Sequence, residues 1–404
     1  MRPWNIGGKM RYDFESKLNR VGKGSPKWDR MVKKRPELST GEVVPLSVAD
    51  MEFPIAPEIR EGLKEYLDQN VLGYTEANDP FFEALISWMK RRHDFDVKRE
   101  WIINTPGVVP AIYAAINKFS NKGDGVIVMP PVYYPFFSAI ELQNRKLVRC
   151  PLIKKERYEI DFELLEELAS KEENKILLFC SPHNPVGRVW EKEELEKIAQ
   201  IVEKNNLIML CDEIHMDFVY KGHKHTVFQT INDKVAEKTI TFTAPSKTFN
   251  LAGMMLSNVI VKNKDLREKL TDSLEAMSIS TCTALGYKAC EIAYNECEDW
   301  FDKCLDVIDE NQKLVKDFFE SKHPDIKAPL LEGTYLQWVD FNSLGMSNEK
   351  LEDFMKNKAG LFLDEGYIFG KEGSGFERIN LAAPKSTIKE SLDRLDKALK
   401  DLRG

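Results

Sequence analysis

The sequence is short of positive charge, of cysteine and of long hydrophobic runs. Its 404 residues hold 58 lysines and arginines against 65 aspartates and glutamates, which gives a net charge of −7. A protein whose main partner is nucleic acid or an anionic membrane usually carries a basic excess, so we expect neither partner. The longest stretches with almost no charge, Trp101–Lys118 and Gly125–Ile140, contain prolines and fall short of the roughly 20 apolar residues that a membrane span needs.

Cysteine is sparse, with seven residues and no pair spaced as Cys-x-x-Cys. Met1–Arg30 lacks the continuous apolar segment of a secretion signal, and scattered thiols are typical of a reducing compartment, so we expect a cytoplasmic protein. Cys290, Cys297 and Cys304 recur every seven residues. This spacing favours one buried stripe of a helix over a metal site, so we expect no metal.

The sequence does contain short apolar strands that alternate with helical patterns between about residues 100 and 265. In Glu191–Lys204, for example, the apolar residues recur at helical spacing between two strand-like runs. Such alternation is typical of an α/β fold with a mainly parallel sheet covered on both faces. The strand-like runs are Gly125–Met129, Ile176–Cys180, Leu207–Cys211, Ile240–Thr243 and Asn258–Val261.

The pattern changes near residue 285. Leu285–Phe319 predicts one long amphipathic helix, and Tyr335–Phe341 and Glu377–Leu381 predict strands before a closing helix over Ser386–Leu402. We therefore expect two domains. A large α/β domain spans 48–285, and a small α+β domain is built from both ends of the chain, 1–47 and 286–404.

Polar side chains follow three of the predicted strands. Asn184 comes after Ile176–Cys180, Asp212 after Leu207–Cys211, and Lys247 after Ile240–Thr243. Because the carboxyl ends of parallel strands line the ligand crevice of an open sheet, these side chains should meet. A lysine in this place can form a Schiff base with an aldehyde cofactor, and an aspartate can hold a pyridinium proton.

Two further segments point to the same crevice. Thr105–Pro110 precedes an apolar helix, so that the amides of Gly107, Val108 and Val109 can receive a phosphate while Pro110 occupies the first helical position. Tyr133 and Tyr134 follow the next strand and offer an aromatic face.

Asn184, Asp212, Lys247 and Arg378, in this order, resemble the site residues of fold-type I pyridoxal 5′-phosphate (PLP) enzymes of the aspartate aminotransferase superfamily. Further motifs resemble the MalY/PatB subgroup of cystathionine β-lyases, and within it the cysteine desulfhydrases of the cystalysin type. The resemblance extends from about residue 11 onward. These motifs are Lys27-Trp28-Asp29, Ser47–Phe53, Gly73-Tyr74-Thr75, Pro245–Asn250, Glu332–Trp338 and Phe376–Ala383.

The resemblance implies a role for each member of the ordered set. Lys247 would carry PLP and move the substrate Cα proton, and Asp212 would pair with the pyridinium nitrogen. Asn184 would donate to the phenolic oxygen of the cofactor and lie beside the substrate. Arg378 would bind the substrate α-carboxylate, for which its planar fork is suited.

The resemblance also implies a wider set of contacts. Tyr133 would stack on the cofactor ring and face the substrate, while Tyr134 would contact either phosphate or substrate. Tyr74 would reach the phosphate in a neighbouring subunit, which makes the active unit a homodimer. The remaining implied contacts are Val108, Val109 and Ser246 to phosphate, His215 beside the cofactor oxygen as a supporting group rather than a base, and Asp50 and Met51 to substrate through the backbone.

One position departs from the wider superfamily. Many aminotransferases have a phosphate-binding arginine eight residues after the lysine, and this sequence has Met255 there. Amides, hydroxyls, Tyr74 or another cation would then have to receive the phosphate.

The combined expectation is α,β-elimination from a small sulfur amino acid of the cysteine or cystathionine type, which yields pyruvate, ammonia and a thiol or sulfide. An aminotransferase would share nearly every residue named above, and a non-catalytic regulatory protein of the same fold is a more distant alternative. A nucleotide-dependent oxidoreductase is excluded, because the third glycine of the dinucleotide motif is missing after Gly123-Asp124-Gly125.

Overall fold

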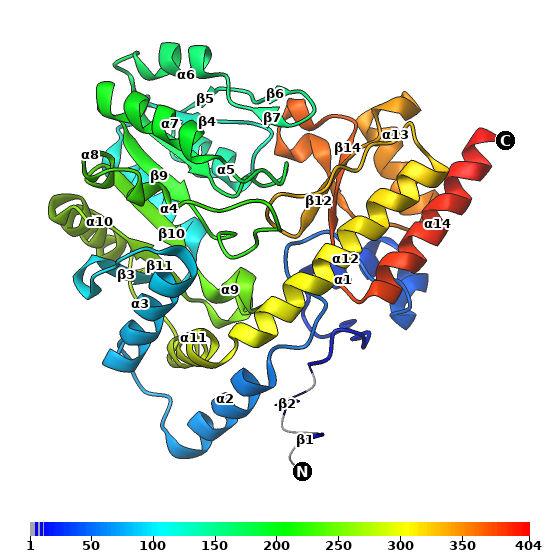
Figure 1. Ribbon diagram of the computed structural model, residues 1–404, viewed down its shortest axis with the longest axis horizontal. Helices are drawn as coiled ribbons and strands as arrows, with labels where there is room; N and C mark the ends of the chain where they lie inside the picture. The colour runs from blue at the N-terminus through cyan, green and yellow to red at the C-terminus, as the bar shows by residue number, and fades with distance from the viewer. Residues whose placement is uncertain (1–4, 7–8, 11) are drawn as a thin grey trace.

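The computed structural model describes residues 5–6, 9–10 and 12–404, and Figure 1 shows the arrangement of their helices and strands. The helices are α1 (Pro26–Lys34), α2 (Pro57–Gln69), α3 (Asp79–His93), α4 (Val108–Phe119), α5 (Pro135–Glu141), α6 (Phe162–Ala169), α7 (Lys192–Lys204), α8 (Asp233–Ala236), α9 (Pro245–Thr248), α10 (Lys264–Ala276), α11 (Ala284–Glu296), α12 (Glu298–Lys322), α13 (Asn348–Asp353) and α14 (Lys385–Arg403). The strands are β1 (Asn5–Ile6), β2 (Lys9–Met10), β3 (Ile102–Thr105), β4 (Gly125–Val128), β5 (Lys146–Arg149), β6 (Ile153–Lys154), β7 (Tyr158–Glu159), β8 (Asn174–Cys180), β9 (Ile208–Asp212), β10 (Thr239–Thr243), β11 (Ser257–Ile260), β12 (Leu336–Asp340), β13 (Asp364–Glu365) and β14 (Phe376–Asn380).

The largest sheet has seven strands in the order β3-β11-β10-β9-β8-β4-β5. The pairs from β10 to β5 are parallel, and β11 runs antiparallel to both of its neighbours. Alternate residues face opposite sides: Leu178 and Leu210 pack in one core with α4, whereas Leu177 and Met209 pack in another with α7. The predicted, mainly parallel sheet with two covered faces is therefore confirmed.

The carboxyl ends of three neighbouring strands coincide. Cys180 of β8 pairs with Asp212 of β9, and Asp212 pairs with Phe242 of β10. The loops after these strands therefore leave the same edge of the sheet. This edge faces the second group of elements in Figure 1.

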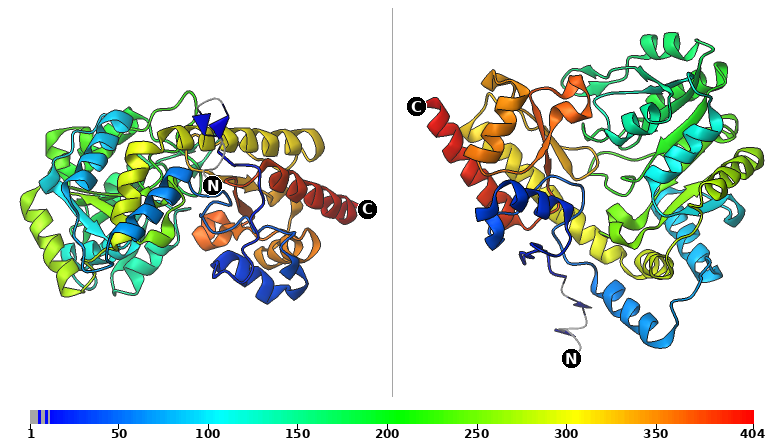
Figure 2. Two further views of the ribbon diagram at one scale, coloured as in Figure 1. Left: turned by 90° about the horizontal axis from the view of Figure 1, so that it is seen from below. Right: turned by 180° about the vertical axis from the view of Figure 1, so that it is seen from behind.

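The second group is a three-stranded antiparallel sheet, β12-β14-β13, with α12, α13 and α14 beside it. Helix α1 lies in the same group in Figures 1 and 2. Lys34, the last residue of this helix, pairs with Glu352 of α13. Lys17, which precedes the helix, pairs with Glu390 of α14. The division at residue 285 stays a prediction, and part of its segment 1–47 lies outside the described residues.

The predicted single helix over Leu285–Phe319 is wrong. The structure has α11 and α12 on either side of Cys297, whose backbone angles of φ −112° and ψ 18° leave the helical region. Cys290, Cys297 and Cys304 are all fully buried, as predicted for a core stripe. Because the apolar spacing continues through the break, hydrophobic periodicity does not reveal it.

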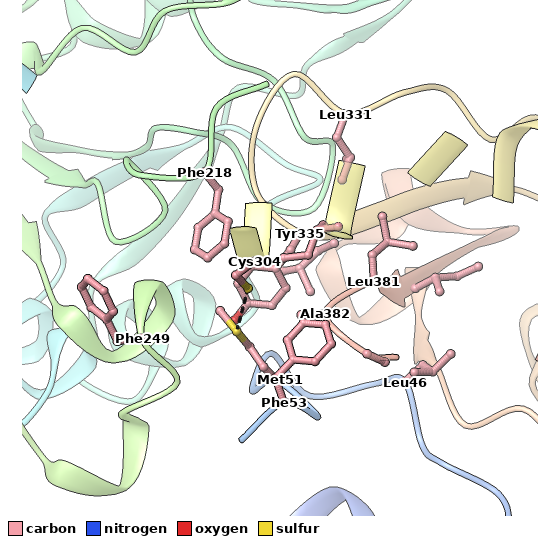
Figure 3. Packing of buried hydrophobic residues seen from close by; sticks show 14 of the residues in the cluster. Leu46, Met51, Phe53, Phe218, Phe249, Cys304, Leu331, Tyr335, Leu381 and Ala382 are labelled. Atoms are coloured by element: carbon pink, nitrogen blue, oxygen red, sulfur yellow. Dashed lines mark hydrogen bonds between the residues drawn. The ribbon is translucent and has the colours of Figure 1, made fainter. Parts of the chain in front are cut away.

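A shared core joins the two groups. Figure 3 shows Met51 and Cys304 pointing toward each other beside Tyr335, with their sulfur atoms 3.8 Å apart. The ring of Phe218 lies edge-on to Tyr335, with 4.8 Å between ring centroids. Across the part of the chain that the structure describes, no helix combines the length and the apolar character needed to cross a membrane.

Candidate active site

Lys247 lies in α9, a single helical turn that follows β10. Its Nζ donates a hydrogen bond to the carbonyl oxygen of Ala49 over 2.8 Å. Burial lowers the pKa of the Lys247 amine to about 8, and the Arg378 guanidinium contributes in the same direction. An amine with this pKa is partly neutral near pH 7, so it can act as a nucleophile or as a base.

Asp212 ends β9 and is buried. Its Oδ1 accepts a hydrogen bond from the Ile214 amide over 3.1 Å. Burial raises the pKa of this carboxyl to about 7, against the opposing effects of that amide and of Lys247. A buried carboxyl of this kind is stabilised as an anion by a cationic group placed against it.

Arg378 in β14 is buried and held on both of its terminal nitrogens. Nη1 donates to Asn184 Oδ1 over 2.9 Å, and Nη2 forms an ion pair with Asp364, the residue opposite it across β13 and β14. The guanidinium lies 4.8 Å from the ring centroid of Phe369. The sequence predicted Arg378 and Asn184, whereas it did not predict Asp364, because its proximity arises from strand pairing.

Tyr133 and Tyr134 precede α5 with their ring centroids 5.6 Å apart. Tyr134 also lies 5.7 Å from the ring of Phe369, and it is partly exposed. Burial raises the pKa of the Tyr133 hydroxyl. The negative charge of Asp212 raises this pKa further, and the positive charge of Arg378 opposes the rise. The two tyrosines therefore stand in the region where the strand-end residues meet.

The amino end of α4 lies beside this region, since Val108 packs in one cluster with Ala244 and Tyr133. The first amides of a helix have no partner within the helix, so those of Val108 and Val109 can bind an anion. The predicted helix start is wrong by two residues: α4 begins at Val108, and Pro110 is its third residue.

Ser246 and Met255 flank Lys247 in the chain. Ser246 is partly buried in α9. Met255 follows a 3₁₀ turn with a left-handed φ of 53° and a half-exposed side chain. A thioether carries no positive charge, so the Met255 side chain cannot pair with a bound phosphate. Backbone amides and hydroxyl groups would have to bind it instead.

Two buried histidines lie near the same edge. Burial keeps the pKa of His215 well below its usual value, with contributions from Lys247 and Arg378, and its Nδ1 has no hydrogen-bond partner within the described chain. Burial lowers the pKa of His183 to about 4, and its Nε2 lies 3.0 Å from the carbonyl oxygen of Pro131. Both histidine rings are therefore neutral near pH 7, which suits residues that position neighbouring groups by hydrogen bonding.

Residues 48–52, here called the strap, run past the Lys247 amine. The amide of Asn380 donates to Val48 O over 3.0 Å and to Asp50 O over 2.8 Å. Asn250 exchanges two hydrogen bonds with the backbone of Met51. The hydroxyl of Tyr335 shares the Ala49 carbonyl with Lys247 over 2.8 Å.

The strap is also held by ion pairs between its own carboxylates, Asp50 and Glu52, and two cations from earlier in the chain. Lys27 Nζ lies 2.7 Å from Asp50 Oδ1 and 2.6 Å from Glu52 Oε1, and Arg20 pairs with the same two carboxylates. Although burial opposes it, Lys27 and Arg20 hold the pKa of Asp50 below its usual range. The ion pairs of Lys27 therefore connect the motif around Lys27 to the motif at 47–53.

The structure gives Asp50 and Met51 partners other than a substrate. The side chain of Asp50 pairs with Lys27 and Arg20, and its carbonyl accepts from Lys27 and Asn380. The side chain of Met51 lies in the core shown in Figure 3. Their predicted substrate contacts stay a prediction.

Tyr74 is not brought to the site within this chain. It is fully exposed on the linker between α2 and α3, which loops away from the sheet in Figure 1. The other predicted residues gather at the carboxyl edge of the seven-stranded sheet or on the elements that face it.

The gathered groups fit PLP. The Lys247 amine suits the aldehyde, the buried Asp212 carboxyl suits a protonated ring nitrogen, and the amides of α4 suit the phosphate. Two buried nitrogens, Arg378 Nε and His215 Nδ1, lack hydrogen-bond partners in the described part of the chain and stand ready for a ligand.

Comparisons with known proteins agree with this geometry. The chain is 36% identical over 394 residues to the cystathionine β-lyase PatB of Bacillus subtilis (strain 168), covering 96% of this chain and 100% of PatB. The crystal structure of cystalysin from Treponema denticola, which contains PLP, shares 59% identity and a TM-score of 0.96, covering 97% of this chain and 100% of that one. A PLP-bound C–S lyase from Staphylococcus hominis shares 29% identity and a TM-score of 0.88, covering 96% and 98%.

These likenesses confirm the predicted fold of type I PLP enzymes. The family model described as aminotransferase class I and II matches residues 41–395. The chain therefore belongs to the aminotransferase class I and II family.

Proposed function

We propose that this protein is a PLP-dependent carbon–sulfur β-lyase acting on small sulfur amino acids such as L-cysteine and L-cystathionine. The observation that carries the proposal is the convergence of three groups: the Lys247 amine with its lowered pKa, the buried Asp212 carboxyl, and Arg378. The names of PatB, cystalysin and the staphylococcal C–S lyase support this reaction and its cofactor.

Different residues of the chain would bind the substrate and transfer its proton. Bound PLP supplies an electron-withdrawing ring that makes the substrate Cα proton removable. Arg378 and Asn184 orient the α-carboxylate, and Lys247 takes the proton because its amine is partly neutral at physiological pH. The β-thiolate then leaves, and the three-carbon product that remains is hydrolysed by one water to pyruvate and ammonia.

We also propose that the active unit is a homodimer in which Tyr74 reaches the neighbouring subunit's phosphate site. Its exposure on the α2–α3 linker supports a partner outside its own chain. All seven cysteines are free thiols, six of them buried, which suits a cytoplasmic location.

A product assay tests the reaction. We expect pyruvate, ammonia and the sulfur product in equal amounts, independent of added keto acid. The sulfur product is sulfide from L-cysteine and a thiol from L-cystathionine or an S-alkyl cysteine. Lys247→Ala should lower kcat about a thousandfold or more. Lys262→Ala, a partly exposed control whose amine pairs with Asp233, should not.

Three results would overturn the proposal. A new amino acid formed in proportion to the keto acid would make the protein an aminotransferase. Full turnover by Lys247→Ala would remove the lysine from the mechanism. Purified protein that takes up no PLP and shows none of its absorption would favour a non-catalytic role.

A further inference from the structure

Asp217 is a buried carboxylate, not included among the predicted site residues, in the loop that leaves β9. Three donors converge on it. Trp88 Nε1 and His93 Nε2 donate to Oδ1 over 3.1 and 2.7 Å, and Thr248 Oγ1 donates to Oδ2 over 2.6 Å. Although burial opposes it, His93 and Thr248 hold the pKa of Asp217 below its usual value.

Thr248 directly follows Lys247 and is fully buried. Both residues belong to α9, whose single turn has little hydrogen bonding of its own to fix its orientation. The Thr248–Asp217 hydrogen bond therefore connects the turn that carries Lys247 to the loop that follows Asp212. The Ala49 carbonyl holds only the far end of the lysine side chain.

The other two donors anchor Asp217 to a rigid neighbour. Trp88 and His93 belong to α3, and the Trp88 ring stacks on Tyr294 of α11 with 5.1 Å between centroids. The same ring lies edge-on to Phe249, which follows Thr248, at 5.5 Å. A contact path thus runs from the packed helices to the turn that carries Lys247.

We propose that Asp217 is a positioning residue for the lyase reaction and acts through the Thr248 hydroxyl to place Lys247. The inference rests on the proposed function. The lysine amine is carried on a flexible four-carbon stem. The position of the amine is therefore defined only if the backbone at the base of the stem is held in place. A misplacement of about 1 Å at a catalytic group can cost on the order of a hundredfold in rate.

The test compares Thr248→Val, Thr248→Ser and Thr241→Val. Thr241 is a matched control because it is fully buried in β10 and its hydroxyl has no hydrogen-bond partner among the described residues. We measure kcat and KM for L-cysteine, the rate at which cofactor-free protein captures PLP, and the unfolding temperature of each variant.

Thr248→Val should lower kcat and slow PLP capture about tenfold each, with KM within about twofold, because the amine is displaced and the carboxylate site is not. Thr248→Ser, which restores the hydroxyl, and Thr241→Val should both stay within about twofold of wild type. If Thr248→Val does not fold, Thr248→Ala against Thr241→Ala replaces the pair.

The positioning role is overturned if Thr248→Val matches Thr241→Val in kcat and PLP capture. It is equally overturned if only the unfolding temperature falls, because a purely structural hydroxyl would act there alone. Wild-type protein that captures no PLP or makes no pyruvate overturns the proposed function as well, so the two failures are distinguishable.

Discussion

Among single residues, the Lys247 amine is the group whose chemistry the fold alters most usefully. Burial in the space between Arg378 and the strap removes water from the ammonium, and the nearby guanidinium repels it. The neutral form is the one that attacks an aldehyde or removes a proton. Its pKa of about 8 therefore sets the pH at which the site becomes reactive.

This pKa predicts how cofactor-free protein takes up PLP at different pH values. Below about pH 8, the capture rate should rise roughly tenfold per pH unit as the amine loses its proton, and above it the rate should level off. Stopped-flow absorbance measures the rate, with a peptide bearing one free lysine as the control. A rate that climbs to pH 10 in step with the peptide would show that the Lys247 pKa is not lowered.

The residues that could be predicted from sequence are those that follow a strand or belong to a known motif. Asn184, Asp212 and Lys247 each stand just after an apolar run, and strand order alone brings them together. Asp364 was not predicted, since it meets Arg378 only through the pairing of β13 with β14. The contact between Lys247 and the Ala49 carbonyl could not be predicted either. Every residue type has the same backbone oxygen, so the sequence does not mark this position.

Among the elements, the strap links regions that are far apart in the sequence. It is held by Lys27 near the amino terminus, by Asn250 after α9 and by Asn380 after Arg378. The strand patterns of the sequence were sufficient to predict five strands of the seven-stranded sheet, which are β4, β8, β9, β10 and β11. Sequence patterns were not sufficient for the strap, which has no regular period, or for the break at Cys297, where the period continues.

The strap's dependence on Lys27 yields a stability prediction. Lys27→Met leaves the partly buried carboxylate of Asp50 and the buried carboxylate of Glu52 with Arg20 as their remaining ionic partner. Removing one partner from a buried ionic cluster typically costs about 3–5 kcal/mol of unfolding free energy. Denaturant unfolding of the cofactor-free protein measures the loss, and hydrogen exchange should accelerate at the amides of residues 48–52.

Lys33→Met is the matched control, because Lys33 lies on the same helix and is exposed. It should change the unfolding free energy by no more than about 0.5 kcal/mol. Equal stability of the two variants, or unchanged exchange in the strap, would show that Lys27 does not hold it.

For the molecule as a whole, the exposed linker between α2 and α3 bears on assembly. Leu72 and Tyr74 are exposed on it, and Val71 is 87% exposed. A run of exposed apolar side chains is a common sign of burial against another chain. In a twofold dimer, each subunit would then complete the other's site, whereas Lys247 and Asp212 would serve their own.

Mixing inactive variants tests this arrangement. Lys247→Ala and Tyr74→Ala, each of low activity alone, should recover about a quarter of wild-type activity when exchanged one to one, because half of the dimers are hybrids with one intact site. Lys247→Ala mixed with Asp212→Ala should recover none, since both residues act within one chain. Two different affinity tags confirm that hybrids form. Hybrids without recovered activity would place Tyr74 outside the neighbouring site, and a monomer by sedimentation would remove the dimer itself.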